Sequence, residues 1–306
     1  MGEITEISWT DHTFNPWIGC TKVSPACDGC YAEHMMAHRY GKVRWGAGED
    51  RKRTAPANWR KPIAWNRAAA AKAGRTFVFC ASLADVFDNE VDPKWRADLF
   101  ALIEATPALT WLLLTKRIGN VLKMTDPMAG CSLIPPNAAI GATMANQEEY
   151  DRDCMKLWEV KRIKEPAFTF GSLEPLLGPI ILDKHAPDWI ITGGETDQGA
   201  HKARPSHPDW FRGLRDQCRE LGRPFHLKQW GEWAPGDAFG LIQDGPVTTR
   251  DGTVRDWMKR YVVCADRADR LDGHSFTGHA TNLVYRVGKK RAGAKLDGVE
   301  HREFPR

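Results

Sequence analysis

The fold is decided between residues 77 and 117, which read FVFCASLADVFDNEVDPKWRADLFALIEATPALTWLLLTKR. Two β-rich runs, FVFCAS (77–82) and TWLLLT (110–115), enclose a segment whose apolar residues recur every three to four positions, as on one helix face. Asp92 and Pro93 stand where an N-cap and the first turn of this helix are expected. The stretch therefore predicts a strand, a helix and a second strand, which is the unit of a parallel sheet.

The same alternation extends in both directions along the chain. Further strands are predicted at 138–144, 167–172, 188–193 and 224–230, with a first strand near 14–18. Two more amphipathic helices lie between them, NQEEYDRDCMKLWEV and HPDWFRGLRDQCREL, and the second is expected to start at Ser206 and Pro208. About seven strands in this order predict an α/β fold, a complete or partial (β/α) TIM-like barrel, with an open doubly wound sheet as the alternative.

We expect one domain over residues 1–306, because no linker, internal repeat or low-complexity tract interrupts the chain. Its predicted parts are a cysteine loop with a basic and aromatic segment (1–76), a βα core (77–233) and an irregular β-rich C-terminal extension (234–306). No run of 18 apolar residues occurs, and the N-terminus lacks the basic start and apolar stretch of a secretory signal. These features predict a cytoplasmic protein that does not contact a membrane.

Polar residues follow each predicted strand. In a parallel barrel the side chains just beyond the strand ends line the active face, so these positions are candidates for binding and catalysis. Lys and Glu in such apolar surroundings need partners, because an unpaired charge is costly to bury. The candidates at the strand ends are Thr115, Lys116, Arg117, Ser172, Glu174, Gly193, Gly194, Glu195 and Lys228.

Three of the eight cysteines crowd into the segment NPWIGCTKVSPACDGCYAEHMMAHRYG, as Cys20, Cys27 and Cys30. The C-x6-C-x2-C spacing lets two thiolates bind one centre from the Asp28-Gly29 turn, and the helix expected after Cys30 would stabilise their charge. Three thiolates without an obvious fourth ligand suit a [4Fe–4S] cluster with one open iron. A zinc site with a histidine as fourth ligand remains open, and so do purely structural thiols; the candidate histidines are His12, His34 and His38.

The run G-C-x6-C-x2-C-Y-A resembles the cluster loop of radical S-adenosylmethionine enzymes, notably the spore photoproduct lyase-like subgroup. The usual spacing there is C-x3-C-x2-C, so three more residues lie between Cys20 and Cys27. A resemblance that covers nearly the whole chain is to a phage-associated three-cysteine-motif family, a domain of unknown function. The motifs that carry it are NPWIGC, SPACDGCYAE, FVFCASLADVFD, LLLTKR, FGSLEPLLGPI, WIITGGE, ARP, HLKQWGEW and KLDGVEHREFP.

The resemblance implies an enzyme with a [4Fe–4S] cluster on the three cysteines and S-adenosylmethionine on the fourth iron. Reduction would then produce methionine and a 5′-deoxyadenosyl radical, which takes a hydrogen atom from a substrate. Cofactor contacts are then expected at Gly193, Gly194, Glu195, Ser172, Glu174 and Thr115. Catalytic or substrate contacts are expected at Lys116, Arg117, Lys228 and Tyr31.

A basic and aromatic segment follows the cysteine loop. Eleven Lys and Arg stand against two acids between Arg39 and Arg75, with several Trp and Tyr interleaved. Cations neutralise phosphates and flat rings stack on bases, so DNA or tRNA is an expected partner. The predicted contacts are Arg51, Lys52, Arg53, Trp59, Arg60 and Lys61. The alternative function is thus a nucleic-acid-binding protein with a structural cluster or zinc. A partner protein is a further candidate partner.

Overall fold

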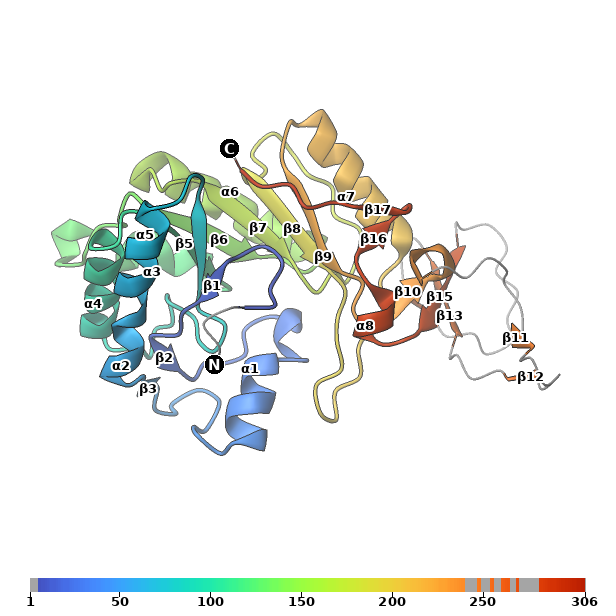
Figure 1. The fold of residues 1–306 in the computed structure, drawn as a ribbon, viewed down its shortest axis with the longest axis horizontal. Coiled ribbons are helices and arrows are strands. Elements are labelled where there is room, and N and C mark those ends of the chain that lie inside the picture. Colours follow the sequence, from blue (N-terminus) through green and yellow to red (C-terminus); the bar gives the residue numbers. More distant parts are fainter. Residues whose placement is uncertain are drawn as a thin grey trace.

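The computed structural model describes residues 5–239 and 281–305, together with 247–248, 254–255, 260–264 and 268–269. Its centre is a curled sheet of seven parallel strands (Figure 1). The strands are hydrogen-bonded in chain order: β1 (His12–Thr13), β4 (Thr76–Cys80), β5 (Leu109–Thr115), β6 (Ala138–Thr143), β7 (Thr169–Leu173), β8 (Trp189–Gly193) and β9 (Phe225–Gln229). In a doubly wound sheet the strand order would reverse partway along the sheet, whereas here it follows the chain throughout. The observed fold is therefore the partial-barrel form of the predicted α/β fold.

The first strand differs from its predicted position. The sequence places it near 14–18, whereas β1 ends at Thr13, opposite Phe79. Pro16 cannot donate to a ladder, so the chain leaves the sheet there. The next residues form β2 (Trp17–Ile18), which pairs antiparallel with β3 (Lys52–Arg53).

Helices connect the strands and cover the outer face of the sheet. Their apolar sides pack on alternate strand residues such as Val78, Leu113 and Ile190. The helix for which Ser206 is the predicted cap has His207 as its N-cap instead, because Ser206 Oγ donates to the Leu176 carbonyl. The helices are α2 (Pro56–Trp59), α3 (Lys61–Ala70), α4 (Pro93–Glu104), α5 (Val121–Met124), α6 (Gln147–Lys164) and α7 (Pro208–Glu220), with 3₁₀ turns η3 (Ile118–Asn120) and η4 (Pro127–Ala129).

The inner face of the sheet carries a second, aromatic core. It consists of Trp9, Phe77, Phe79, Leu112, Ala139, Phe168, Phe170, Trp189 and Ile191. Gly141 lies among them, and a Cβ there would stand 2.3 Å from the Phe170 ring. The inner face of the half-barrel is therefore filled by these side chains.

The C-terminal segment covers the free edge of β9. His301 O accepts from Leu227 N at 3.0 Å, and Phe304 stacks on Phe77 at 5.8 Å between ring centroids. Beside it His226 is fully buried, with its Nε2 3.0 Å from Ser8 Oγ. Residues from both ends of the chain thus seal the side on which the barrel is not closed.

The region after β9 contains short antiparallel pairs, in keeping with the β-rich character expected of the extension. A four-stranded sheet has the order β10-β15-β13-β14, with β10 (Trp233–Pro235), β15 (Thr281–Arg286), β13 (Arg260–Cys264) and β14 (Ala268–Asp269). The other elements are η5 (Gly236–Phe239), β11 (Val247–Thr248), β12 (Val254–Arg255), α8 (Lys289–Ala292), β16 (Lys295–Leu296) and β17 (Val299–Glu300). No helix of the described ranges combines the length and apolarity needed to span a membrane.

Candidate functional site

The cysteine loop follows β2 and lies against the carboxyl ends of the barrel strands. It contains η1 (Pro25–Cys27), α1 (Tyr31–Glu33) and a π-helical turn η2 (His34–Arg39). Cys27 is buried, whereas Cys20 and Cys30 are half-buried, and all three are free thiols. Tyr31, a candidate substrate contact, begins α1 and is 54% exposed.

One end of the loop is held by Arg117, just beyond β5. Its Nη1 lies 3.4 Å from Cys20 Sγ and its Nη2 donates to Thr21 O at 2.8 Å. Asp85 orients this guanidinium, accepting from Arg117 Nη1 at 3.1 Å and from Thr115 Oγ1 at 2.7 Å. Thr115 is thus buried beneath the loop as a partner of Asp85, and Arg117 faces a cysteine.

Arg51 holds the same end of the loop through Thr21. Its guanidinium is 1% exposed and donates to Asp88 at 2.8 Å and to Glu90 at 2.6 Å. A further bond of 2.8 Å reaches Thr21 Oγ1. Arg51, expected to contact nucleic acid, is therefore engaged inside the protein.

The other end of the loop is held by Glu195 and Arg204. Arg204 donates to both Glu195 oxygens, from Nη2 at 2.6 Å and from Nε at 2.9 Å. The same guanidinium reaches Asp28 Oδ2 at 3.0 Å and Pro25 O at 2.9 Å. Glu195 thus holds the Cys27–Cys30 turn through Arg204. Arg204 was not among the residues predicted at the strand ends, although it lies in the ARP motif.

Glu195 is ionised in this arrangement. Burial alone would raise the pKa of its carboxyl, but the hydrogen bonds and charge of Arg204 outweigh burial and hold the pKa below its usual value. His201 Nε2 lies 3.1 Å from Glu195 Oε1 and adds to the effect. A Cβ on Gly29 would stand 2.6 Å from the His201 ring and 3.1 Å from Glu195 Oε1, so the turn requires glycine there.

Gly193 and Gly194 permit close backbone approach at the end of β8. A Cβ on Gly194 would lie 1.9 Å from Trp230 O, and one on Gly193 would lie 3.2 Å from the Glu174 carboxyl carbon. Beside them Lys228 Nζ donates to Glu174 Oε1 at 2.6 Å. The geometry thus leaves one carboxylate and one ammonium, both partly exposed, as a pair at the mouth of the half-barrel.

Successive side chains of a strand point to opposite faces of the sheet, so the inner-face residues at this mouth can be found by counting in twos along each strand. Counting along β5 from the inner residue Leu112 places Lys116 on the inner face, and counting along β7 from Phe170 places Ser172 there. The same count from Ala139 reaches Thr143, which is buried and whose Oγ1 has no hydrogen-bond partner among the described residues. The mouth is therefore polar above an aromatic floor.

The thiols of Cys20 and Cys30 are protonated at neutral pH. Burial raises the pKa of Cys20 to about 11, with Asp85 adding to the effect and Arg117 opposing it. Burial also raises the pKa of Cys30, although backbone N–H groups of Glu33 and Ala32 and the Lys116 ammonium act in the opposite direction. Metal binding would therefore have to release protons.

The fit of the loop to a metal group can be judged from its donors. No three His, Cys, Asp or Glu side chains are already arranged around one point within the described ranges. The donor chemistry fits an iron–sulfur cluster, because N–H groups and cations face the sulfurs of Cys20 and Cys30, as hydrogen-bond donors do around bound clusters. Of the histidines considered for zinc, His12 stacks on Trp65 at 4.4 Å and His38 is largely exposed.

The other five cysteines lie outside the loop. Cys80, Cys154 and Cys218 are buried, Cys131 is only half-buried, and Cys264 lies outside the residues whose side chains are described.

The predicted nucleic-acid residues other than Arg51 lie nearer the surface. Lys52 and Arg60 are exposed, and Lys61 is half-buried. Arg53 pairs with Asp98 at 2.7 Å and lies 4.3 Å over the half-buried Trp59 ring.

Comparison with known proteins gives one family match, over residues 4–305, and the family is described as "Protein of unknown function (DUF5131)". The match covers nearly the whole chain, as the sequence motifs indicated, while the phage association stays a prediction. A search of curated proteins finds no match. Among solved structures, the chain is similar to a mutant spore photoproduct lyase with bound AdoMet and dinucleoside spore photoproduct, at 12% identity and a TM-score of 0.43, covering 91% of this chain and 68% of that chain.

Proposed function

The chain belongs to this family of unknown function, so its activity has to be inferred from its own site, and we propose that it is an iron–sulfur enzyme of the radical S-adenosylmethionine type. The observation that carries the proposal is the position of the cysteine loop. It is pinned at Cys20 by Arg117 and at Asp28 by Arg204, so both ends lie at the carboxyl-terminal mouth of a parallel half-barrel, where such folds bind ligands.

In this proposal Cys20, Cys27 and Cys30 hold the cluster. When bound, a [4Fe–4S] cluster with one open iron supplies the electron that splits S-adenosylmethionine into methionine and a carbon-centred radical. The chain supplies orientation: Arg117 and Arg204 fix the two ends of the loop before any ligand arrives, which reduces the entropy lost on binding.

The Glu174–Lys228 pair suits the amino-acid end of S-adenosylmethionine. A carboxylate can accept from an α-ammonium and an ammonium can donate to an α-carboxylate, and the two groups stand 2.6 Å apart. Glu195 is less free for this task because Arg204 already occupies both of its oxygens. Thr143, whose hydroxyl is buried with no hydrogen-bond partner among the described residues, offers a further polar contact at the same mouth.

Water exclusion would come from the floor of the half-barrel. Phe79, Phe170 and Trp189 close it below the mouth, so a ligand held there has the filled core on one side and the cysteine loop on the other. A low-dielectric, enclosed site of this kind protects a reactive species from solvent.

The experiment is anaerobic reconstitution with iron and sulfide, followed by metal analysis, absorption spectroscopy and incubation with S-adenosylmethionine under reduction. We expect about four irons per chain and reductive cleavage of S-adenosylmethionine. Cys27→Ala should lose both, whereas the control Cys218→Ala, which alters a buried cysteine outside the loop, should keep both. Stoichiometric zinc with no iron uptake would favour the alternative of a structural zinc site. A cluster without cleavage would favour a purely structural role.

A second proposal is that nucleic acid is the partner. The observation in its favour is that Lys52 and Arg60 are exposed along the segment that follows the cysteine loop, near Arg53 over Trp59. Exposed cations attract phosphates, and the test is the salt dependence of binding described in the Discussion.

A further inference from the structure

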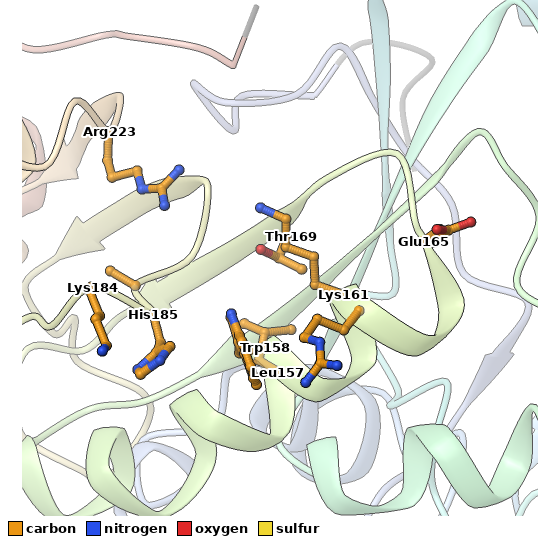
Figure 2. A pocket seen from close by; sticks show the side chains of 10 residues that line it. Leu157, Trp158, Lys161, Glu165, Thr169, Lys184, His185 and Arg223 are labelled. Carbon is orange, nitrogen blue, oxygen red and sulfur yellow. The ribbon is translucent and has the colours of Figure 1, made fainter.

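A cavity of about 280 Å³ lies at the end of the sheet opposite to the cysteine loop. Figure 2 shows its lining, which comes from the last turns of α6, the start of β7, the β7–β8 connection and the turn before β9. Because all seven strands are parallel, the starts of β7 and β9 mark the end of the sheet remote from Glu174 and Lys228. The cavity is therefore separate from the candidate active site.

The lining is strongly basic. Four cations surround the cavity, Lys161, Arg162, Lys184 and Arg223, against one lining acid, Glu165. Asp188 adds a second carboxylate, which accepts from Lys161 at 2.5 Å and from Arg223 at 3.1 Å. Asp183 also faces the lining, at 3.2 Å from His185 Nδ1, so four positive charges stand against three carboxylates.

The pKa of the Asp188 carboxyl reflects the positive charges around it. Burial alone would raise its pKa, yet hydrogen bonds from Lys161 and Thr169 outweigh burial and lower it. Asp188 pairs with Lys161 and Arg223, whereas Lys184 and Arg162 form no ion pair with it within 4.0 Å. A second anion in the cavity would therefore still be attracted by those two side chains.

Arg223 carries a donor that no described residue satisfies. Its Nε is buried and has no hydrogen-bond partner among the described residues, although Nη1 of the same guanidinium bonds Asp188. A buried, charged N–H without an acceptor costs free energy, and native structures fill such positions with water or an ion.

Helix electrostatics explain only part of this cluster. Lys161 and Arg162 stand in the last turn of α6, where cations interact favourably with the helix dipole. Lys184 and Arg223 come from two other connections, so the helix sequence alone does not account for their presence at the cavity. Arg162 also lies 4.8 Å over the Trp158 ring, which places its guanidinium against one wall of the cavity.

We propose that this cavity binds the phosphate group of a small molecule. A phosphate monoester carries close to two negative charges at neutral pH and three acceptor oxygens, which suit a cavity where four cations outnumber the carboxylates. The volume of about 280 Å³ exceeds the roughly 30 Å³ share of one water molecule several times over, so it also leaves room for the group that bears the phosphate.

The test is isothermal titration calorimetry of the full chain with three probes: inorganic phosphate, adenosine monophosphate and adenosine. The wild type should bind the two phosphate-bearing probes and not adenosine. Lys184→Glu and Arg162→Glu should each weaken binding by at least about tenfold, since they reverse a charge at the cavity. Both residues are exposed, so the variants should fold, which thermal unfolding checks. The control is Arg67→Glu, an exposed arginine in the last turn of α3.

Equal affinity for phosphate and the nucleotide would identify a site for phosphate alone, and tighter nucleotide binding would identify a phosphate ester as the ligand. Both results support the proposal. No binding of either probe in the millimolar range overturns it, as does wild-type affinity in Lys184→Glu and Arg162→Glu, or binding of adenosine as tight as that of its monophosphate.

Discussion

Replacing Arg204 with methionine tests whether the cysteine loop depends on its clamp. The change keeps an unbranched side chain and removes four side-chain hydrogen bonds, two to Glu195, one to Asp28 and one to Pro25 O. Glu195, whose side chain is 4% exposed, would lose the cation that compensates its charge.

The magnitude follows from burial. Removing one partner of a fully buried ion pair costs about 3–5 kcal/mol. Arg204 is 34% exposed, so water screens part of the interaction and we expect a loss of about 2 kcal/mol. For a chain of 306 residues this corresponds to a decrease in Tm of roughly 3 °C.

The assay combines thermal unfolding, limited proteolysis of residues 20–30 and iron content after reconstitution. We expect the loop to be cleaved faster and to retain less iron. Arg212→Met is the matched control, because Arg212 is about as exposed as Arg204 and also pairs with two carboxylates, but these, Asp209 and Asp297, are 44% and 39% exposed and stay solvated without it. It should cost less than about 1 kcal/mol and leave iron unchanged. If Arg204→Met retains wild-type Tm, loop protection and iron, the clamp does not hold the loop.

Three other predictions rest on separate groups. Glu174→Gln should leave the iron content unchanged and weaken binding of S-adenosylmethionine about tenfold in calorimetry, since the α-ammonium of the ligand loses its carboxylate acceptor; unchanged affinity would remove Glu174 from the site. Burial lowers the pKa of His226 to about 4 from 6.5, so the wild type should lose about 3 kcal/mol of stability as pH falls from 6.5 to 4, and His226→Phe should lose less over the same range in unfolding titrations. Lys52→Glu with Arg60→Glu should weaken DNA or tRNA binding and flatten its salt dependence, by about one unit of slope for each phosphate that these cations neutralise in the wild type; filter binding across a salt series measures the slope, and an unaltered slope would exclude both cations from the interface.

Local sequence patterns were sufficient to predict the strands and to recognise the cluster of cysteines. Period-two and period-3.6 recurrence depends on which face of an element is buried, and neighbours in sequence carry that information. The seven sheet strands were predicted in number and order, and the first was displaced because Pro16 ends it earlier. The clustering of three cysteines in eleven positions also needs no tertiary information to be recognised.

The partners of the charged residues were decided by the tertiary structure alone. Sequence reasoning assigned Arg51 to a nucleic acid and Arg117 to a substrate, yet Arg51 meets Asp88 and Arg117 meets Asp85 and Cys20. A charged side chain pairs with whichever opposite charge the fold brings within about 4 Å, and Arg117 lies 97 positions from Cys20.

The same reason explains Glu195 and its clamp. The sequence determined that a carboxylate follows two glycines at a strand end, a position typical of a ligand contact. Only the fold brings Arg204 back across both Glu195 oxygens and onto the Asp28 turn, 176 positions away in the chain. The residue types that could do chemistry were thus readable from the sequence, but which of them are free to do it depends on long-range pairing that no local pattern records.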